Sequence, residues 1–105
     1  MLDISHLPKA LLDAPLGDRN MEKAVGEDRD VWNLSECSLS SMKYQISCGY
    51  PVCAKWTDDS SVLITGYDQF NIWIYDKAAG EPKAVAFEDA EAACEAAGNI
   101  FYSYH

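Results

Sequence analysis

The sequence predicts an α+β fold in which two or three helices pack on an antiparallel sheet of about four strands. Two observations lead to this prediction. Apolar residues follow a helical spacing in segments 38–49 and 87–97, and three short apolar or alternating segments between them indicate consecutive strands. The 105 residues, of which 49% are hydrophobic and 24% charged, are typical of one globular domain with a packed core.

Residues 1–34 are the least regular part of this predicted domain, and they favour two short helices. The first helix follows Ser5 and carries the leucines Leu7, Leu11 and Leu12. The second helix spans about residues 20–25 and ends at Gly26, because glycine readily takes the backbone conformation that ends a helix.

The middle of the chain predicts a helix followed by a meander of three strands. Ser38 is a suitable helix N-cap, and Gly49 ends the helix. The three strands that we expect are 51–56, 61–65 and 70–75. In the third strand the core-facing residues should be Phe70, Ile72 and Ile74.

The C-terminal part predicts a loop at 78–82, a helix at 87–97 and a last strand at 100–104. Small apolar residues recur at helical spacing and can form the inner stripe of this helix, which Gly98 then ends. The members of the stripe are Ala90, Ala93, Cys94 and Ala97.

The net charge of −9 disfavours direct binding to nucleic acid and to anionic membranes, and it favours attraction to basic surfaces. No apolar segment approaches the roughly 20 residues that a membrane helix needs, and the N-terminus lacks the features of a signal peptide. We therefore expect a cytoplasmic protein with four reduced cysteines. The cysteine and histidine spacings indicate no metal site, and no motif indicates a cofactor.

From about Leu34 to Tyr104 the chain resembles the second half of a papain-like cysteine peptidase, of the group that processes bacteriocins after double-glycine leaders. The resemblance rests on an ordered series of short matches: Gly49, Pro51 and Val52, then "VLITGYD" from Val62 to Asp68, then Asp76, and finally Gly98 and Asn99. It implies a papain-like core at residues 35–105, preceded by the N-terminal segment 1–34.

The residues that such a peptidase uses for catalysis are missing from the matching positions. In the family a histidine begins the central strand, and Ser60 or Ser61 stands there in this chain. The family's nucleophilic cysteine precedes this region, but residues 1–34 contain no cysteine. Asp76 keeps the place of the acid that orients the histidine, and it is either a structural turn acid or a vestige of that site. The resemblance therefore implies a vestigial site at Ser60, Ser61 and Asp76 and no peptidase activity, because the chemistry needs a thiolate activated by an imidazole.

An unconventional catalytic pair is the remaining enzymatic hypothesis. Cys37 lies just before a predicted helix, where the helix N-terminus can activate a thiol. Its partner would be His6 or His105, and both lie near a chain end, where residues are often mobile.

Two surfaces are candidates for binding. Asn71, Trp73 and Tyr75 should lie on the face of their strand that points away from the core, unless the first thirty residues cover them. The helix at 87–97 bears four acids and no base, which gives either a solvated face or a contact surface for a basic partner. These acids are Glu88, Asp89, Glu91 and Glu95. The acids Asp58, Asp59 and Asp68 are interpreted as turn residues.

Three functional classes follow from these observations. The first is a non-catalytic protein-binding module, such as a small acidic inhibitor or regulator that occupies a partner's surface. The second is a more specific form of the first, a phage-encoded inhibitor of the anti-CRISPR type that blocks a nucleic-acid-binding site. The third is a cysteine peptidase with an unconventional pair. The expected partner is a protein, in the second class a basic nucleic-acid-binding protein, and a homodimer is also compatible with the sequence.

Overall fold

The computed structural model describes residues 7–26, 28–57, 60–76 and 79–105. Within these ranges the chain forms one six-stranded sheet in the order β1-β6-β2-β3-β4-β5, and each pair of neighbouring strands is antiparallel. The strands are β1 (Val31–Asn33), β2 (Val52–Thr57), β3 (Ser60–Tyr67), β4 (Asn71–Asp76), β5 (Glu81–Ala86) and β6 (Phe101–Tyr104). The helical elements are the 3₁₀ helix η2 (Lys9–Asp13) and the α-helices α1 (Asp18–Val25), α2 (Leu39–Ser47) and α3 (Phe87–Ala96).

The predicted α+β class is confirmed, but the expected number of about four strands is too low. The two missed strands lie at the edges of the sheet. β1 has only three residues and follows a charged turn, so its apolar signal is short. β5 contains Pro82, which cannot donate a backbone hydrogen bond, and it begins inside the segment that was expected to be a loop. An edge strand tolerates both features because only one side of it is paired.

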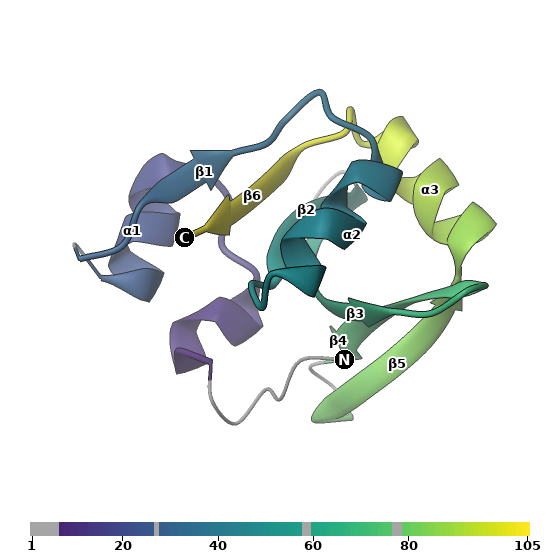
Figure 1. The fold of residues 1–105 in the computed structure, drawn as a ribbon, viewed down its shortest axis with the longest axis horizontal. Helices are drawn as coiled ribbons and strands as arrows, with labels where there is room; N and C mark the ends of the chain where they lie inside the picture. The colour runs from purple at the N-terminus through teal and green to yellow at the C-terminus, as the bar shows by residue number, and fades with distance from the viewer. Residues whose placement is uncertain (1–6, 27, 58–59, 77–78) are drawn as a thin grey trace.

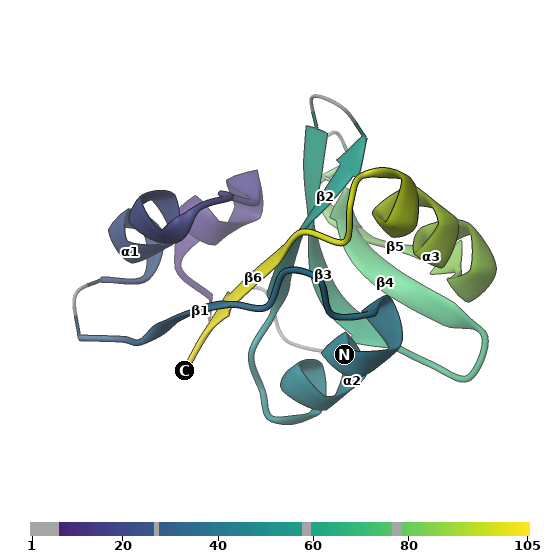
Figure 2. The same ribbon diagram turned by 90° about the horizontal axis from the view of Figure 1, so that it is seen from above.

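Helices cover both faces of the sheet (Figures 1 and 2). α2 and α3 pack on one face, whereas η2 and α1 pack on the other. This arrangement follows from alternation along the central strand, because successive side chains point to opposite faces. Leu63 belongs to the cluster beneath η2 and α1, and Ile64 belongs to the cluster beneath α2 and α3.

The larger core lies between the sheet and the pair α2 and α3. Phe101, on β6, is among the largest of its fully buried side chains. α2 contributes Leu39, Met42 and Ile46, which are apolar residues of the helical spacing noted in segment 38–49. α3 contributes Ala90 and Cys94, while the other two predicted members of its inner stripe, Ala93 and Ala97, are half-buried.

The second core shows that the N-terminal segment packs on the sheet. Leu11 from η2 and Met21 from α1 are fully buried against Cys53, Leu63 and Tyr104. The Sγ atom of Cys53 lies 3.6 Å from the Sδ atom of Met21. The two predicted helices of this segment are present, the first as the short helix η2 and the second as α1, which ends at Gly26 as expected.

The ends of the two longer helices also follow the sequence signals. The Ser38 hydroxyl accepts a hydrogen bond from the backbone N–H of Ser41 at 3.3 Å, which confirms the predicted N-cap of α2. At the end of α3, Gly98 has a φ of 94°, and Asn99 donates its N–H back to the carbonyl of Cys94 at 2.8 Å. A left-handed glycine at this position satisfies carbonyls that the helix leaves unpaired.

A buried polar side chain ties α2 to the end of β6. Gln45 is only 4% exposed, and its Nε2 donates to the Ser103 hydroxyl and to the Tyr104 carbonyl, each at 3.0 Å. The Ser103 hydroxyl in turn donates to the carbonyl of Pro51 at 2.7 Å. Buried polar groups that are hydrogen-bonded in this way fix the position of the elements that carry them. Helical periodicity alone does not reveal Gln45 as an inward-facing residue.

Candidate functional site

The turn between β3 and β4 is organised by one carboxylate. Asp68 accepts hydrogen bonds from the backbone N–H groups of Phe70 and Asn71 at 2.9 and 2.8 Å. The Oδ2 atom of Asp68 accepts a hydrogen bond from the indole Nε1 of Trp73 at 3.1 Å. The side-chain Nδ2 of Asn71 donates to the Oδ1 atom of Asp68 at 3.2 Å. Asp68 is therefore a turn residue, as the sequence indicated, and it also fixes the backbone of Phe70 and the ring of Trp73.

These hydrogen bonds predict a measurable pH dependence. The bond from the Phe70 N–H, with those from Trp73 and Asn71, lowers the pKa of Asp68 below its ordinary value of 3.8. A carboxyl whose pKa is lowered on folding stabilises the fold above pH 3.8, and this stabilisation is lost as the pH falls through the folded-state value. In Asp68→Asn the melting temperature should therefore fall less between pH 6 and pH 3 than in the wild type. Parallel pH profiles of the two proteins would contradict this assignment.

The strand β4 carries the three residues that were expected to form an exposed aromatic face. Tyr75 is half-buried and packs against the core beneath the N-terminal segment. The N-terminal segment therefore covers Tyr75, which is the second of the two arrangements that the sequence allowed. Trp73 is half-buried and bound to Asp68, and Asn71 is half-buried in the same turn. The structure brings Trp73 and Asn71 together around Asp68. Tyr75 lies farther along the strand, where the N-terminal segment packs over it.

Phe70 is the residue for which the sequence prediction was wrong. It was expected to face the core together with Ile72 and Ile74, and both isoleucines are indeed buried. Phe70 is instead 72% exposed, because it lies in the turn before β4 begins and does not take part in the alternation of that strand.

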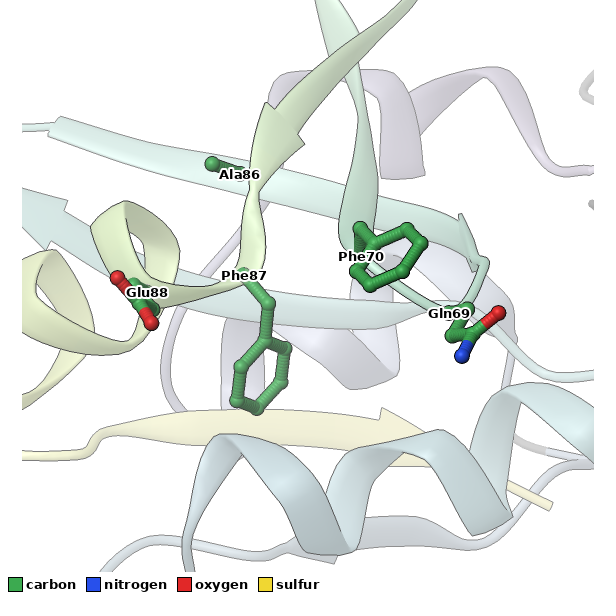
Figure 3. Close-up of a pocket in the computed structure, with 5 residues that line it drawn as sticks. All are labelled: Gln69, Phe70, Ala86, Phe87 and Glu88. Atoms are coloured by element: carbon green, nitrogen blue, oxygen red, sulfur yellow. The ribbon is translucent and has the colours of Figure 1, made fainter.

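The exposed ring of Phe70 forms one wall of a shallow pocket of about 300 Å³ (Figure 3). The residues that line the pocket come from the β3–β4 turn and from the junction of β5 with α3: Gln69, Phe70, Ala86, Phe87 and Glu88. The two segments are joined directly, since the N–H of Phe87 donates to the carbonyl of Phe70 at 2.8 Å. Apolar spacing alone did not reveal this site, but an Asp-x-Phe turn directly after a strand is the signal that could have done so.

A lysine packs beside this pocket. The Nζ of Lys43, on α2, lies 4.4 Å from the centroid of the Phe87 ring and 5.5 Å from that of Tyr67. Tyr67 is held in place by a hydrogen bond of 2.6 Å between its hydroxyl and that of Ser47. Cation–π contacts of this kind show that the Phe87 ring offers an electron-rich face to a positive charge.

The four acids of α3 begin at the pocket and continue along the helix. Glu88 and Asp89 occupy its first turn, where the positive end of the helix dipole favours carboxylates. Glu88, Asp89 and Glu95 are exposed and Glu91 is half-buried, while Ala90 and Cys94 face the core. The structure therefore places the predicted acidic helix and the unpredicted Phe70–Phe87 pocket side by side.

Ser60, Ser61 and Asp76 lie at the opposite end of the β3–β4 hairpin. The strands β3 and β4 are antiparallel, with Ile64 opposite Ile74. The start of β3 and the end of β4 therefore lie at the same end of the hairpin. The Ser61 hydroxyl donates to the carbonyl of Ala14 at 2.6 Å, which ties β3 to the N-terminal segment. One carboxylate oxygen of Asp76 accepts from the N–H of Ala79 at 3.3 Å. The register thus places the three residues that the resemblance marks as vestigial at one end of this hairpin.

Cys37 and His105 are far apart in the described structure. The ladder of β1 and β6 pairs the backbones of Asp30 and His105 at one end and of Glu36 and Asn99 at the other. Cys37 follows Glu36, so about six residues of extended chain, roughly 20 Å, separate it from His105. The His105 ring stacks on Trp32 with a centroid distance of 4.7 Å.

His6, Asp58 and Asp59 lie outside the described residues.

Two other thiols are buried on the two faces of the sheet. Burial raises the pKa of Cys53 to about 12 and that of Cys94 to about 11, in the second case with a contribution from the charge of Glu95. A raised pKa leaves almost no thiolate at neutral pH, so both residues serve as small apolar core residues.

Within the described part of the chain, His, Cys, Asp and Glu side chains form no group of three that could hold a metal ion. No helix in that part has the length and apolar character needed to cross a bilayer.

Comparison with known proteins relates this chain to one fold. No family model matches the chain, and no curated protein matches it. Among solved structures, the chain is similar to the crystal structure of a putative C39-like peptidase from Bacillus anthracis, with a TM-score of 0.66 and 19% sequence identity. The match covers 83% of this chain and 56% of that one, so this chain spans little more than half of its neighbour. The similarity confirms the predicted papain-like α+β fold.

Proposed function

We propose that this chain is a non-catalytic protein-binding module that docks the acidic side of α3 and the adjoining Phe70–Phe87 pocket on a basic surface of a partner protein. The observation that carries the proposal is the juxtaposition of the four α3 acids with an aromatic side chain that is 72% exposed. A solvated acidic helix needs no exposed phenylalanine beside it. An interface commonly combines an aromatic anchor with surrounding charges that steer the partner.

The positions of the nucleophilic residues support a role without peptidase chemistry. Catalysis of the papain type needs a thiolate beside an imidazole. The position that resembles the family's histidine is Ser60 or Ser61, and the Ser61 hydroxyl is bound to the carbonyl of Ala14. Cys37 and His105 stand at opposite ends of the β1–β6 ladder. On this proposal the hairpin serves as a scaffold that presents the Phe70–Phe87 pocket at its other end.

The charge of the chain defines the partner that fits this surface. A net charge of −9 on 105 residues repels other acidic molecules, and the α3 acids concentrate part of it on one helix. The complementary surface is rich in Lys and Arg, which is the composition that proteins use to bind nucleic acid. Occupying such a surface would make the chain an inhibitor or regulator of its partner.

Charge reversal on α3 tests the proposal. The partner is first captured with tagged protein and then purified, and its affinity is measured at stepped salt concentrations. The variant Glu88→Lys/Glu91→Lys/Glu95→Lys should bind at least about tenfold more weakly at low salt, because Debye screening is weakest there. In the wild type the affinity should fall as salt rises. Cys37→Ala should bind like the wild type.

A matched control separates the surface from the overall charge. Each reversal adds two charges, so Glu22→Lys/Asp28→Lys/Glu36→Lys also takes the net charge from −9 to −3, but at exposed positions outside α3. This control should lose much less affinity than the α3 variant. Equal losses in both variants, or an affinity that responds neither to salt nor to reversal, would refute the α3 surface. Loss of function in folded Cys37→Ala would favour the peptidase hypothesis.

A further inference from the structure

The backbone on both sides of the Phe70–Phe87 pocket is held by hydrogen bonds before anything binds. Asp68 accepts from the N–H of Phe70, and the carbonyl of Phe70 accepts from the N–H of Phe87. Both aromatic residues therefore have fixed backbones, and Figure 3 shows their side chains on the two segments that border the pocket. A preorganised site loses little conformational entropy on binding, which favours recognition of a small group.

The polar lining of the pocket is negative. Glu88 lines it and Asp89 follows in the same helical turn, so two carboxylates stand at the N-terminus of α3. The helix dipole supplies only about half a positive charge at this end. The carboxylates therefore outweigh the dipole, and the pocket attracts a cation. Gln69 adds an amide side chain, whose oxygen can accept a hydrogen bond from a cationic donor.

Two aromatic rings, a carboxylate and an amide are together suited to a guanidinium group. A guanidinium is planar, stacks on aromatic faces and donates in pairs to carboxylates, whereas an ammonium is compact and strongly hydrated. Lys43 already holds its ammonium group over the Phe87 ring at 4.4 Å, but it does not line the pocket. Its positive charge opposes any incoming cation, so stacking on Phe70 and pairing with Glu88 must supply the attraction.

We propose that the Phe70–Phe87 pocket binds a single arginine side chain of the partner protein. The inference rests on the proposed function, which it deepens by naming the group that is recognised. The volume of about 300 Å³ lies at the lower end of the range for small-ligand pockets, and suits one side chain better than a folded segment. The guanidinium stacks on Phe70, Glu88 accepts its N–H groups, and Gln69 accepts from the rim.

An NMR titration with a small probe tests the pocket without the partner. The probe is N-acetyl-arginine amide at low salt, added to ¹⁵N-labelled protein, with the citrulline analogue as a neutral molecule of the same shape. Binding in the millimolar range should shift the amide signals of residues 69–70 and 86–88. The citrulline analogue should bind at least about tenfold more weakly, because it has lost the charge that pairs with Glu88. Glu88→Gln should weaken arginine binding to a similar degree.

A pair of aromatic substitutions provides the matched control. Phe70→Ala should reduce arginine binding at least about tenfold, whereas Tyr44→Ala should leave it unchanged. Tyr44 is 74% exposed on α2 and Phe70 is 72% exposed, so neither substitution should unfold the protein. Circular dichroism verifies this for both variants. Equal effects of the two substitutions would overturn the proposal, as would equal binding of arginine and citrulline.

The outcomes also separate this inference from the function on which it rests. If the partner still binds in a salt-dependent manner that needs the α3 acids, while arginine shifts no signal at the pocket, then the pocket assignment fails alone. If partner binding is also indifferent to α3, the proposed function fails with it. Shifts at the pocket that appear on raising the protein concentration without any probe would show a second copy as the occupant, and would overturn the arginine assignment.

Discussion

Replacing Phe101 with alanine is expected to lower the free energy of unfolding by about 3–5 kcal/mol, the range found for removing a large aromatic side chain from a protein core. Phe101 is 0% exposed and lies on β6, where its backbone pairs with Ala54 of β2 beneath α2 and α3. Its removal leaves a cavity in the larger core, which the surrounding side chains fill only in part. Denaturant unfolding followed by circular dichroism measures the change.

The same substitution at Phe70 is the matched control. Phe70 is 72% exposed, so Phe70→Ala should change the stability by no more than about 0.5 kcal/mol. Natural domains have only about 5–15 kcal/mol of stability in total, so Phe101→Ala should bring this chain close to unfolding at 25 °C. A loss below about 1 kcal/mol for Phe101→Ala, or equal losses for the two variants, would contradict the placement of the core.

The contrast between these two phenylalanines shows what a sequence pattern can predict. Phe101 alternates with Tyr102 in the short strand β6, and it lies on the face of that strand that packs in the larger core. Phe70 has the same relation to Ile72 and Ile74, but the Asp68 carboxylate accepts the N–H of Phe70 and bends the chain into a turn. A side chain that accepts hydrogen bonds from nearby backbone N–H groups favours a turn, even where the alternation of apolar residues would continue the strand. The alternation of β4 therefore begins after Phe70.

The edge strands were missed for a different reason. α2, β2, β3 and α3 carry strong periodic signals because each buries residues in the larger core. β1 and β5 bury much less: the residues of β1 are half-buried or exposed, and in β5 only Pro82 and Val85 are half-buried. Backbone pairing with a neighbour, and not burial of side chains, makes these segments strands. Backbone pairing, whether with the distant β6 as in β1 or with the adjacent β4 as in β5, leaves no periodic pattern of apolar side chains.

The candidate site was predictable only in part. The acids of α3 were evident from the sequence, because an outward helix face must carry the polar residues. The pocket beside them depends on the contact between the β3–β4 turn and the start of α3, which are seventeen residues apart at Phe70 and Phe87. Such a contact arises from the order of the strands in the sheet. The coverage of Tyr75 by the N-terminal segment likewise follows from tertiary packing alone.

The second large effect concerns that N-terminal segment. Leu11→Ala is expected to lower the free energy of unfolding by about 2–5 kcal/mol, because Leu11 is 0% exposed between η2 and the sheet. Leu12, the next residue of the same helix, is half-buried and gives the matched control. Leu12→Ala should cost clearly less, since its side chain leaves a smaller cavity when it is removed. Denaturant unfolding of both variants measures the difference.

Cys53 reports whether the loss is local. Burial raises the pKa of this thiol to about 12, so in the wild type it should react very slowly with a thiol reagent at pH 8. If Leu11→Ala loosens η2 and α1 from the sheet, the Cys53 pKa should return toward its ordinary value of 9.0, and labelling should accelerate more than tenfold. Cys94, on the other face, should stay protected, and mass spectrometry distinguishes the two sites. Equal acceleration at Cys53 and Cys94 would mean that the sheet opens as a whole, and unchanged labelling at both would mean that Leu11 does not hold the segment in place.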